Sequence, residues 1–168
     1  MKSVFNDPGL RFIFSTRAKV PMILDASGNE MFAGDYAFTS GKDDIVREGT
    51  AGYVVSFGAG LYRALDAVEK LKAEGIDVGL INKGTLNVVD EESMAKFGGS
   101  PMVLVVEAFN RRTGLGSRMG SWLLERGLTP KYAHIGTHIE GSGGLWEQFP
   151  HQGIDSAGIV AKVKEMLG

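Results

Sequence analysis

The stretch that decides the fold is residues 53–65, YVVSFGAGLYRAL. A run of β-branched and apolar residues meets Gly58, Ala59 and Gly60, and an amphipathic helical pattern follows. A strand, a glycine turn and a helix in this order are typical of α/β sheets. The same order occurs where backbone N–H groups at a helix start bind a pyrophosphate. The stretch therefore raises two hypotheses, a nucleotide site and a turn that only connects two packed elements.

The alternation continues along the chain. Apolar runs at 77–86, 101–109 and 131–138 are typical of strands, and 101–109 is the most continuous of them. Apolar stripes at helical spacing begin at Leu61, Leu115 and Ile159, while Asp90 and Asp155 are predicted to cap the helices that follow them. Residues 139–154 are predicted to be mostly loop with one helical turn. Strands that alternate with helices over short connections predict a parallel sheet with right-handed crossovers.

Residues 1–50 have a different character. Two short strand-like runs, at 10–15 and 20–24, precede a polar, glycine-punctuated stretch at 25–44 that is typical of a loop or hairpin. This part holds too few apolar residues to close a core of its own. We therefore expect it to be the end of a larger body or a linker, and to precede an α/β domain at 51–168.

The bulk composition excludes several classes of function. The 168 residues carry a net charge of −2, with no run of like charges, which gives no electrostatic case for nucleic acid or an anionic membrane. The absence of cysteine excludes zinc–thiolate sites, iron–sulfur clusters and a thiol nucleophile, and fits a reducing cytoplasm. Neither a signal-peptide pattern nor an apolar run of about 18 residues is visible.

The dinucleotide fingerprint is present only in part, so we favour the connecting turn over a nucleotide site. Arg63 stands where a dinucleotide fingerprint places its third glycine, and Asn82 and Lys83 stand where it places the ribose-binding acid, although Lys83 would suit a 2′-phosphate. A second glycine cluster, TGLGSRMG at 113–120, misses the fingerprint spacing by one residue. We expect both clusters to serve close packing, with nucleotide or anion binding as the alternative.

The candidate chemical groups are few. His134 and His138 are expected to lie roughly 13 Å apart on one strand, and His151 lies in a predicted loop, so the three histidines do not form a metal set. Glu107, near the end of the predicted central strand, is the best-placed carboxylate, because sites of open α/β sheets lie at that edge. Arg111 and Arg112 follow it, so the three residues are candidates for catalysis or for an ion-pair cluster at an interface.

Arg17, in the segment FSTRAKVP, is a further candidate. A loop arginine beside Ser15 and Thr16 suits a phosphate, which its planar guanidinium can bind through two hydrogen bonds. A solvated surface charge is the equal alternative.

Three stretches together resemble one family. Residues 47–92 (REGTAGYVVSFGAGLYRALDAVEKLKAEGIDVGLINKGTLNVVDEE), 104–127 (LVVEAFNRRTGLGSRMGSWLLERG) and 153–167 (GIDSAGIVAKVKEML) resemble the C-terminal domain of transketolases. Residues 10–24 are similar to the last strands of that family's pyrimidine-binding domain. Ketoacid dehydrogenase β chains and deoxyxylulose-phosphate synthases share the C-terminal domain, but GTAGYVVSFG and NKGTLNVVDEE favour the transketolase branch.

The resemblance implies a three-layer α/β/α domain with a mostly parallel five-stranded sheet, preceded by an N-terminal extension of short strands and loop. It implies that residues 1–50 are a remnant of the pyrimidine-binding domain and linker. The implied activity of the full assembly is the transfer of a two-carbon ketol unit between sugar phosphates, with thiamine diphosphate and Mg²⁺. The family's GDG…N cofactor motif is absent from this chain. So is the acid that activates the aminopyrimidine ring.

The chain is therefore expected to act as a scaffold and dimer-contact section, in a cytoplasmic homodimer, and to be inactive without the upstream transketolase domains. Whether those domains belong to the same polypeptide or to another stays open. Only Arg17 matches a functional position of the family, the sugar-phosphate-binding arginine of an SR motif, with one residue inserted here. A dinucleotide-binding domain and a stand-alone interaction or regulatory module remain the alternatives.

Overall fold

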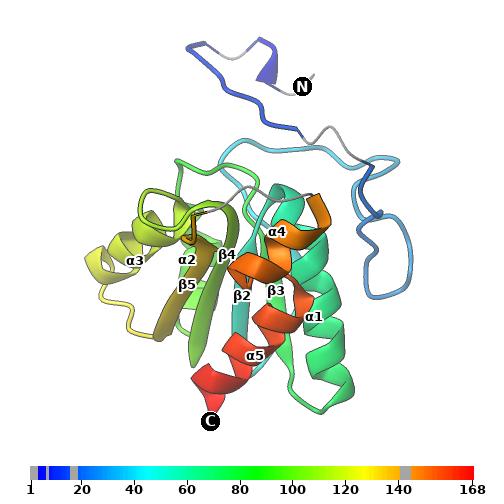
Figure 1. The fold of residues 1–168 in the computed structure, drawn as a ribbon. Helices are drawn as coiled ribbons and strands as arrows, with labels where there is room; N and C mark the ends of the chain where they lie inside the picture. Colours follow the sequence, from blue (N-terminus) through cyan, green and yellow to red (C-terminus); the bar gives the residue numbers. More distant parts are fainter. Residues whose placement is uncertain (1–3, 7, 16–18, 141–144) are drawn as a thin grey trace.

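A computed structural model of the chain describes residues 4–6, 8–15, 19–140 and 145–168, and only the backbone of 145–147. Strands and helices alternate through most of its length (Figure 1). The elements in chain order are β1 Asp44–Arg47, β2 Gly52–Ser56, η2 Gly58–Gly60, α1 Leu61–Ala73, β3 Val78–Asn82, α2 Glu91–Gly98, β4 Met102–Asn110, α3 Leu115–Glu125, β5 Lys131–Thr137, α4 Leu145–Gln152 and α5 Ser156–Leu167.

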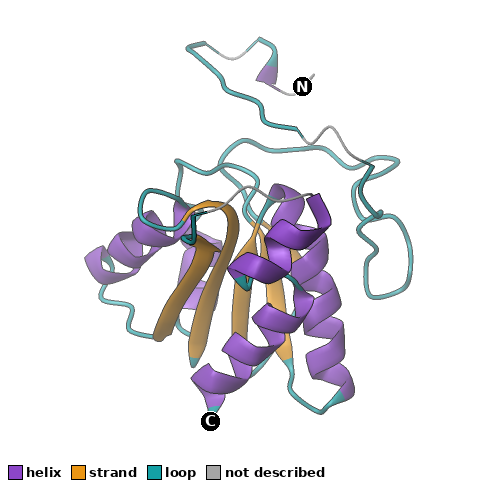
Figure 2. Cartoon of the chain, in the orientation of Figure 1, coloured by secondary structure: helices purple, strands orange, loops and turns teal. Residues whose placement is uncertain are grey.

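The five strands form one sheet in the order β1-β3-β2-β4-β5. Strands β2, β3, β4 and β5 run parallel, and β1 joins the edge of β3 in antiparallel orientation. Helices α1 and α5 pack on one face of the sheet, and α2 and α3 pack on the other (Figure 2). The predicted three-layer architecture with a mostly parallel five-stranded sheet is confirmed.

The centre of the sheet is built from the most apolar runs of the chain. Every residue of β2 is buried, as are the first six residues of β4. Burial on both faces requires side chains that are apolar at consecutive positions, and the β4 sequence MVLVVE begins in that way. Helices α1 and α3 each contribute one buried stripe, which is the expected consequence of their helical spacing.

The structure differs from the sequence-based expectation in three places. Residues 44–47, which the sequence analysis assigned to a loop and linker, form the edge strand β1. Helix α4 is a helix of two turns rather than a single turn in a loop. The strand-like runs at 10–15 and 20–24 form no strand in their described residues, and Leu24 makes only an isolated bridge with Glu30.

The reason for the third difference is the lack of a partner edge. A β-strand is stable only where its backbone groups pair with a neighbour. The described N-terminal residues run outside the α/β body instead (Figure 1). Their large apolar side chains are exposed: Phe5, Leu10, Phe12, Ile13, Phe14, Val20, Met22 and Leu24.

Two smaller expectations can also be checked. Asp155 caps α5, because its carboxylate accepts a hydrogen bond of 3.0 Å from the Gly158 N–H. Asp90 occupies the N-cap position of α2, but its side chain makes no capping hydrogen bond. In the part of the chain that the structure describes, no helix is long and apolar enough to cross a membrane.

Candidate functional site

The carboxyl edge of the parallel strands is the place to look for a site. Ligands of open α/β sheets bind outside the carboxyl ends of the strands. At this edge β2 leads into the glycine turn Gly58–Gly60, and β4 leads to Arg111 and Arg112 and then to α3. The two glycine clusters of the sequence therefore lie where a nucleotide or anion site would be expected.

The first cluster is a tightly packed turn. A Cβ at Gly60 would lie 2.6 Å from Ser56 Oγ, and that hydroxyl donates a hydrogen bond of 2.9 Å to the Val106 carbonyl. Only glycine lets the turn approach β2 and β4 so closely. Gly58 has a positive φ of 53°, a conformation that other residues rarely adopt. The packing hypothesis for this turn therefore has a direct structural basis.

The Arg63 side chain packs beside the same turn. Its guanidinium lies 3.3 Å from the ring centroid of Phe149 in α4 and donates a hydrogen bond of 2.6 Å to the Ala59 carbonyl. It also donates to the Tyr62 hydroxyl. The side chain that replaces the third fingerprint glycine thus joins α4 to the start of α1.

At the second glycine cluster, a carboxylate of the protein itself binds the N–H groups at the start of α3. Glu107 is 1% exposed, and its two carboxylate oxygens accept hydrogen bonds of 2.8 and 2.9 Å from the N–H groups of Leu115 and Gly116. A negative charge at a helix N-terminus is stabilised by the helix dipole and by these N–H groups. Glu107 therefore takes the place at α3 that a pyrophosphate would need.

Close contacts with side chains of the sheet explain two glycines of this cluster. The three atoms nearest to a Cβ at Gly114 all belong to the Glu107 carboxyl group, and those nearest to a Cβ at Gly116 belong to His134 of β5. Close packing of the first turn of α3, as the sequence analysis expected, explains why glycine stands at both positions.

Glu107, Arg111 and Arg112 do not form the ion-pair cluster that was one of the two hypotheses. Glu107 is buried against α3, whereas Arg111 and Arg112 are exposed. Within the described residues, neither arginine has a carboxylate within 4.0 Å. The Arg111 N–H instead joins the end of β5, at 3.1 Å from the Thr137 carbonyl oxygen. A role of the two arginines at an interface stays a prediction, and Arg17 lies outside the described residues.

The structure reveals a buried ion pair that the sequence analysis missed. Lys83 directly follows β3 and Asp43 directly precedes β1, and their side chains, each 1% exposed, approach to 2.7 Å. The Lys83 ammonium also donates to the Val88 carbonyl at 2.7 Å. Burial raises the pKa of the Asp43 carboxyl, and the hydrogen bond from Lys83 opposes that rise. Lys83, the one residue that suited a 2′-phosphate, is thus committed to an internal contact.

Asp90 extends this pair into a network. Its carboxylate accepts hydrogen bonds of 3.0 Å from the Asp43 N–H and from the Lys42 ammonium. Burial acts to raise the pKa of Asp90, but these hydrogen bonds hold it below its usual value. The network joins the segment before β1 to the loop between β3 and α2.

Two of the three histidines lie on neighbouring segments, because the His138 N–H donates a hydrogen bond of 2.8 Å to Gln152 Oε1, next to His151. His134 lies in β5, where its Nδ1 is buried without a hydrogen-bond partner among the described residues. His138 follows β5, with its Nδ1 at 3.0 Å from the Gly136 carbonyl oxygen, and His151 lies in the last turn of α4. Among the described residues, no group of three acidic or histidine side chains could hold a metal ion.

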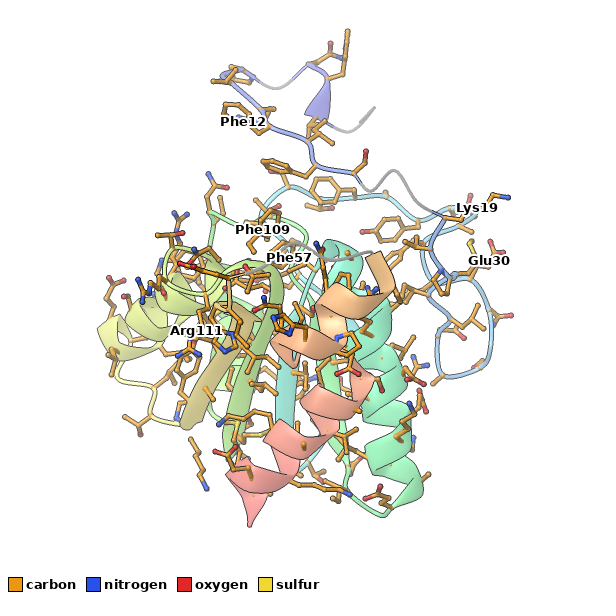
Figure 3. The ribbon with its side chains drawn as sticks, viewed as in Figure 1. Phe12, Lys19, Glu30, Phe57, Phe109 and Arg111 are labelled. Atoms are coloured by element: carbon orange, nitrogen blue, oxygen red, sulfur yellow. The ribbon has the colours of Figure 1, made fainter. Side chains whose placement is uncertain are left out.

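An aromatic cluster lies at the carboxyl ends of β2 and β4. Phe57 and Phe109 (Figure 3) stack with ring centroids 5.6 Å apart. Phe14 contacts Phe109 edge-on, with ring centroids 6.3 Å apart. Phe109 is 47% exposed and Phe14 is 74% exposed. The sequence analysis did not predict this cluster. Phe109 closes the apolar run of β4, and the apolar pattern of LRFIFS is the only signal that pointed to Phe14.

Comparisons with known proteins agree with this fold. The family model for the transketolase C-terminal domain matches residues 41–159. An uncharacterized transketolase family protein of Sinorhizobium fredii is 31% identical over 90% of this chain and 43% of its own length. A 1-deoxy-D-xylulose-5-phosphate synthase of Geobacter metallireducens is 31% identical over 76% of this chain and 21% of its own length.

A solved structure is also similar. It is described as "Split gene transketolase, inactive beta4 tetramer", and it superposes with a TM-score of 0.76 at 26% identity. The match covers 83% of this chain and 46% of that one. The chain therefore spans less than half the length of the relatives it matches.

Proposed function

Because the chain belongs to the transketolase C-terminal domain family, we propose that it is the C-terminal section of a thiamine-diphosphate-dependent enzyme. In this proposal the full assembly transfers a two-carbon ketol unit between sugar phosphates, as in the cytoplasmic pentose phosphate pathway. The chain supplies a scaffold and a dimer contact, and a homodimer is the expected state of the assembled enzyme. The upstream domains, on the same or a separate polypeptide, supply the catalytic groups.

The exposed apolar surface of the N-terminal segment carries the proposal. Phe12 and Phe14 are 76% and 74% exposed, so the contact of Phe14 with Phe109 of β4 leaves most of both side chains uncovered. A contiguous apolar surface of this kind is typical of a region that packs on a partner. The segment lies next to Phe109 at the carboxyl edge of the sheet. A preceding domain that packs on this segment would give residues 10–15 the neighbouring strand that they lack.

The described residues do not fit the cofactor. They hold no cluster of metal-binding side chains, and the N–H groups at the start of α3 are bound by Glu107. We therefore assign thiamine diphosphate and Mg²⁺ to the upstream domains and derive no catalytic step in this chain. The similarity to a split-gene transketolase described as inactive supports the view that this section needs its partner.

The test is reconstitution with an upstream section that carries the GDG motif. We expect the two polypeptides to form a stable complex in sedimentation velocity, and ketol transfer from a ketose phosphate to an aldose phosphate to appear only in the mixture. Activity of the chain without a partner would contradict the proposal. So would the absence of both a complex and activity, which would favour the interaction-module alternative.

Two variants locate the contact. Phe12→Asp and Phe14→Asp place a charge on the apolar segment and should weaken the complex. Leu124→Asp is the matched control, because Leu124 is also exposed, at 73%, but lies on α3. Equal effects of all three substitutions would show that the N-terminal segment is not the contact.

A further inference from the structure

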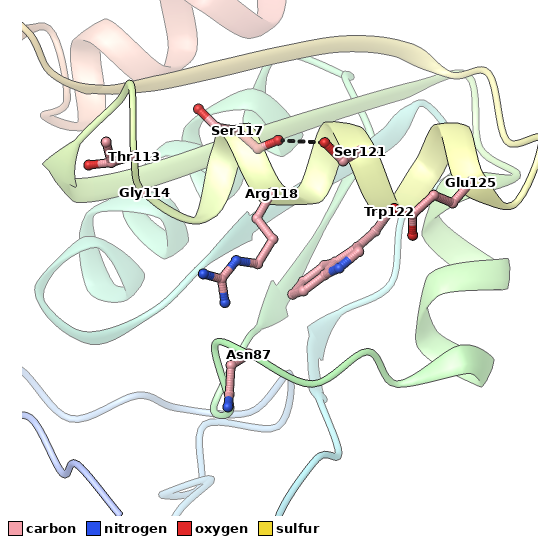
Figure 4. Close-up of a pocket in the computed structure, with 8 residues that line it drawn as sticks. All are labelled: Asn87, Thr113, Gly114, Ser117, Arg118, Ser121, Trp122 and Glu125. Atoms are coloured by element: carbon pink, nitrogen blue, oxygen red, sulfur yellow. Dashed lines mark hydrogen bonds between the residues drawn. The ribbon is translucent and has the colours of Figure 1, made fainter.

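An open groove runs along α3, beside the N–H groups that Glu107 binds. Its volume is about 560 Å³, and it lies between α3 and the loop that carries Asn87 (Figure 4). Arg118 and Trp122 project into it from one face of the helix, with Asn87 on the opposite side.

Arg118 is a cation without an internal counter-ion. Among the described residues no carboxylate lies within 4.0 Å of its guanidinium, and its one aromatic contact is with the Trp122 ring at 5.9 Å. Thr113 and Gly114, which line the groove toward the start of α3, bring no charge of their own. The Arg118 end of the groove therefore carries an unpaired positive charge, which favours an anion.

The other end of the groove is acidic. Glu125 is the acidic residue in its lining, and Arg126, which lies 3.7 Å from it, makes its shorter ion pair with Glu91, at 2.6 Å. An anion is therefore favoured only at the Arg118 end, and the Glu125 carboxylate can accept hydrogen bonds from hydroxyl or amide donors. The groove thus presents one cationic end for a compact anion and one polar end for hydroxyl or amide groups.

Trp122 provides a flat surface between the two ends. The indole is half-buried and packs against the core beneath α3, so its position is fixed before a ligand binds. The Asn87 side chain makes no hydrogen bond within the described part of the chain, which leaves its amide donors and oxygen available. Fixed aromatic rings bind the faces of bases and sugars, and free amides bind their polar edges.

We propose that this groove binds a phosphate monoester of a small ring compound, with the phosphate on Arg118 and the ring against Trp122. The site does not depend on the proposed ketol transfer, and its charged and aromatic side chains, Arg118 and Trp122, come from the body of α3. Nucleoside monophosphates and sugar phosphates share the required chemistry. Binding there would give the chain a ligand of its own.

Isothermal titration calorimetry of the 168-residue chain tests the proposal with adenosine monophosphate, glucose 6-phosphate, inorganic phosphate, adenosine and glucose. We expect saturable binding of at least one of the two esters, and weaker binding of inorganic phosphate and of the compounds without phosphate. The ester that binds more tightly shows whether the ring belongs to a nucleoside or to a sugar. Absence of saturable binding of either ester below about 10 mM would overturn the proposal. Equal affinity for inorganic phosphate and the esters would overturn it too.

Variants then place the ligand in the groove. Arg118→Gln should weaken ester binding about ten- to hundredfold, the usual effect of losing a charge-assisted hydrogen bond. Lys72→Gln is the control, because it removes one exposed positive charge from α1. Thermal unfolding without ligand shows whether each variant is folded. If the folded Arg118→Gln variant binds the ester as tightly as the Lys72→Gln variant, the groove is not the site.

Discussion

The cap that Glu107 forms on α3 predicts a strong coupling with Gly114. The φ and ψ of Gly114, −80° and −165°, lie in the extended region that alanine also adopts. The cost of Gly114→Ala should therefore come from its contacts. The three atoms nearest to the added Cβ are carboxyl atoms of Glu107, so the methyl group must displace that carboxylate from Leu115 and Gly116.

The magnitude follows from the two hydrogen bonds at stake. A hydrogen bond to a charged group contributes roughly 1.5–3 kcal/mol, and a buried N–H left without a partner costs about 1–3 kcal/mol. Because a displaced carboxylate keeps part of these interactions, we expect Gly114→Ala to lower the free energy of unfolding by about 2–4 kcal/mol. In a Glu107→Ala background the methyl group meets no carboxylate. Its cost should then fall to about 1 kcal/mol or less, the ordinary penalty for alanine in place of glycine at an N-cap.

The assay is a double-mutant cycle from urea unfolding, followed by circular dichroism. The control replaces Glu125, an exposed carboxylate of the same helix, with alanine, and Gly114→Ala should keep its full cost in that background. If Gly114→Ala costs the same with and without Glu107, the two residues are not coupled. The account of this glycine, and of the closed start of α3, would then be wrong.

Three further predictions concern other residues. Lys83→Met should destabilise the fold by about 3–5 kcal/mol, because it leaves Asp43 charged and buried. Adding Asp43→Leu to the same chain should restore most of the lost stability. Denaturant titration of the single and the double variant measures both effects. The lowered pKa of Asp90 means that its ionised form stabilises the fold above the unfolded pKa of about 3.9, and that this contribution is lost as pH falls below that value. The stability difference between the parent chain and Asp90→Asn should therefore be largest near neutral pH and shrink below about pH 4, and a pH-independent difference would contradict the role of its charge. In the reconstituted enzyme, Arg17→Ala should raise the KM for a phosphorylated sugar about ten- to hundredfold if Arg17 binds the phosphate, and an unchanged KM would place it outside the site.

Local patterns were sufficient for most of the secondary structure. The helical spacing from Leu61 and the apolar run that ends at Phe109 each report burial within one element, and burial of that kind is visible in consecutive residues. Strand β1 was missed because it has only four residues, of which one is buried, so it shows neither alternation nor a long apolar run. Its place depends on the free edge of β3, which no local pattern reveals.

The candidate site was less accessible to sequence analysis. Glu107 was chosen correctly as the carboxylate at the carboxyl edge, but the pattern left catalysis and an interface as its possible roles. Its partners are the N–H groups of Leu115 and Gly116, and backbone groups have no signature in the sequence. The groove on α3 was not predicted, because its two sides come from separate segments.

By itself the sequence determined the alternation of strands and helices, the need for glycine at the tight turns and the resemblance to one family, because each is encoded in residues close together along the chain. Only the tertiary structure decided that Lys83 belongs to Asp43, 40 residues away, and that Glu107 closes α3. The physical reason is that a buried charge takes the partner that the packed backbone brings within hydrogen-bonding distance. The identity of that partner depends on how the layers of the fold pack together, and the spacing of residues along the chain does not reveal it.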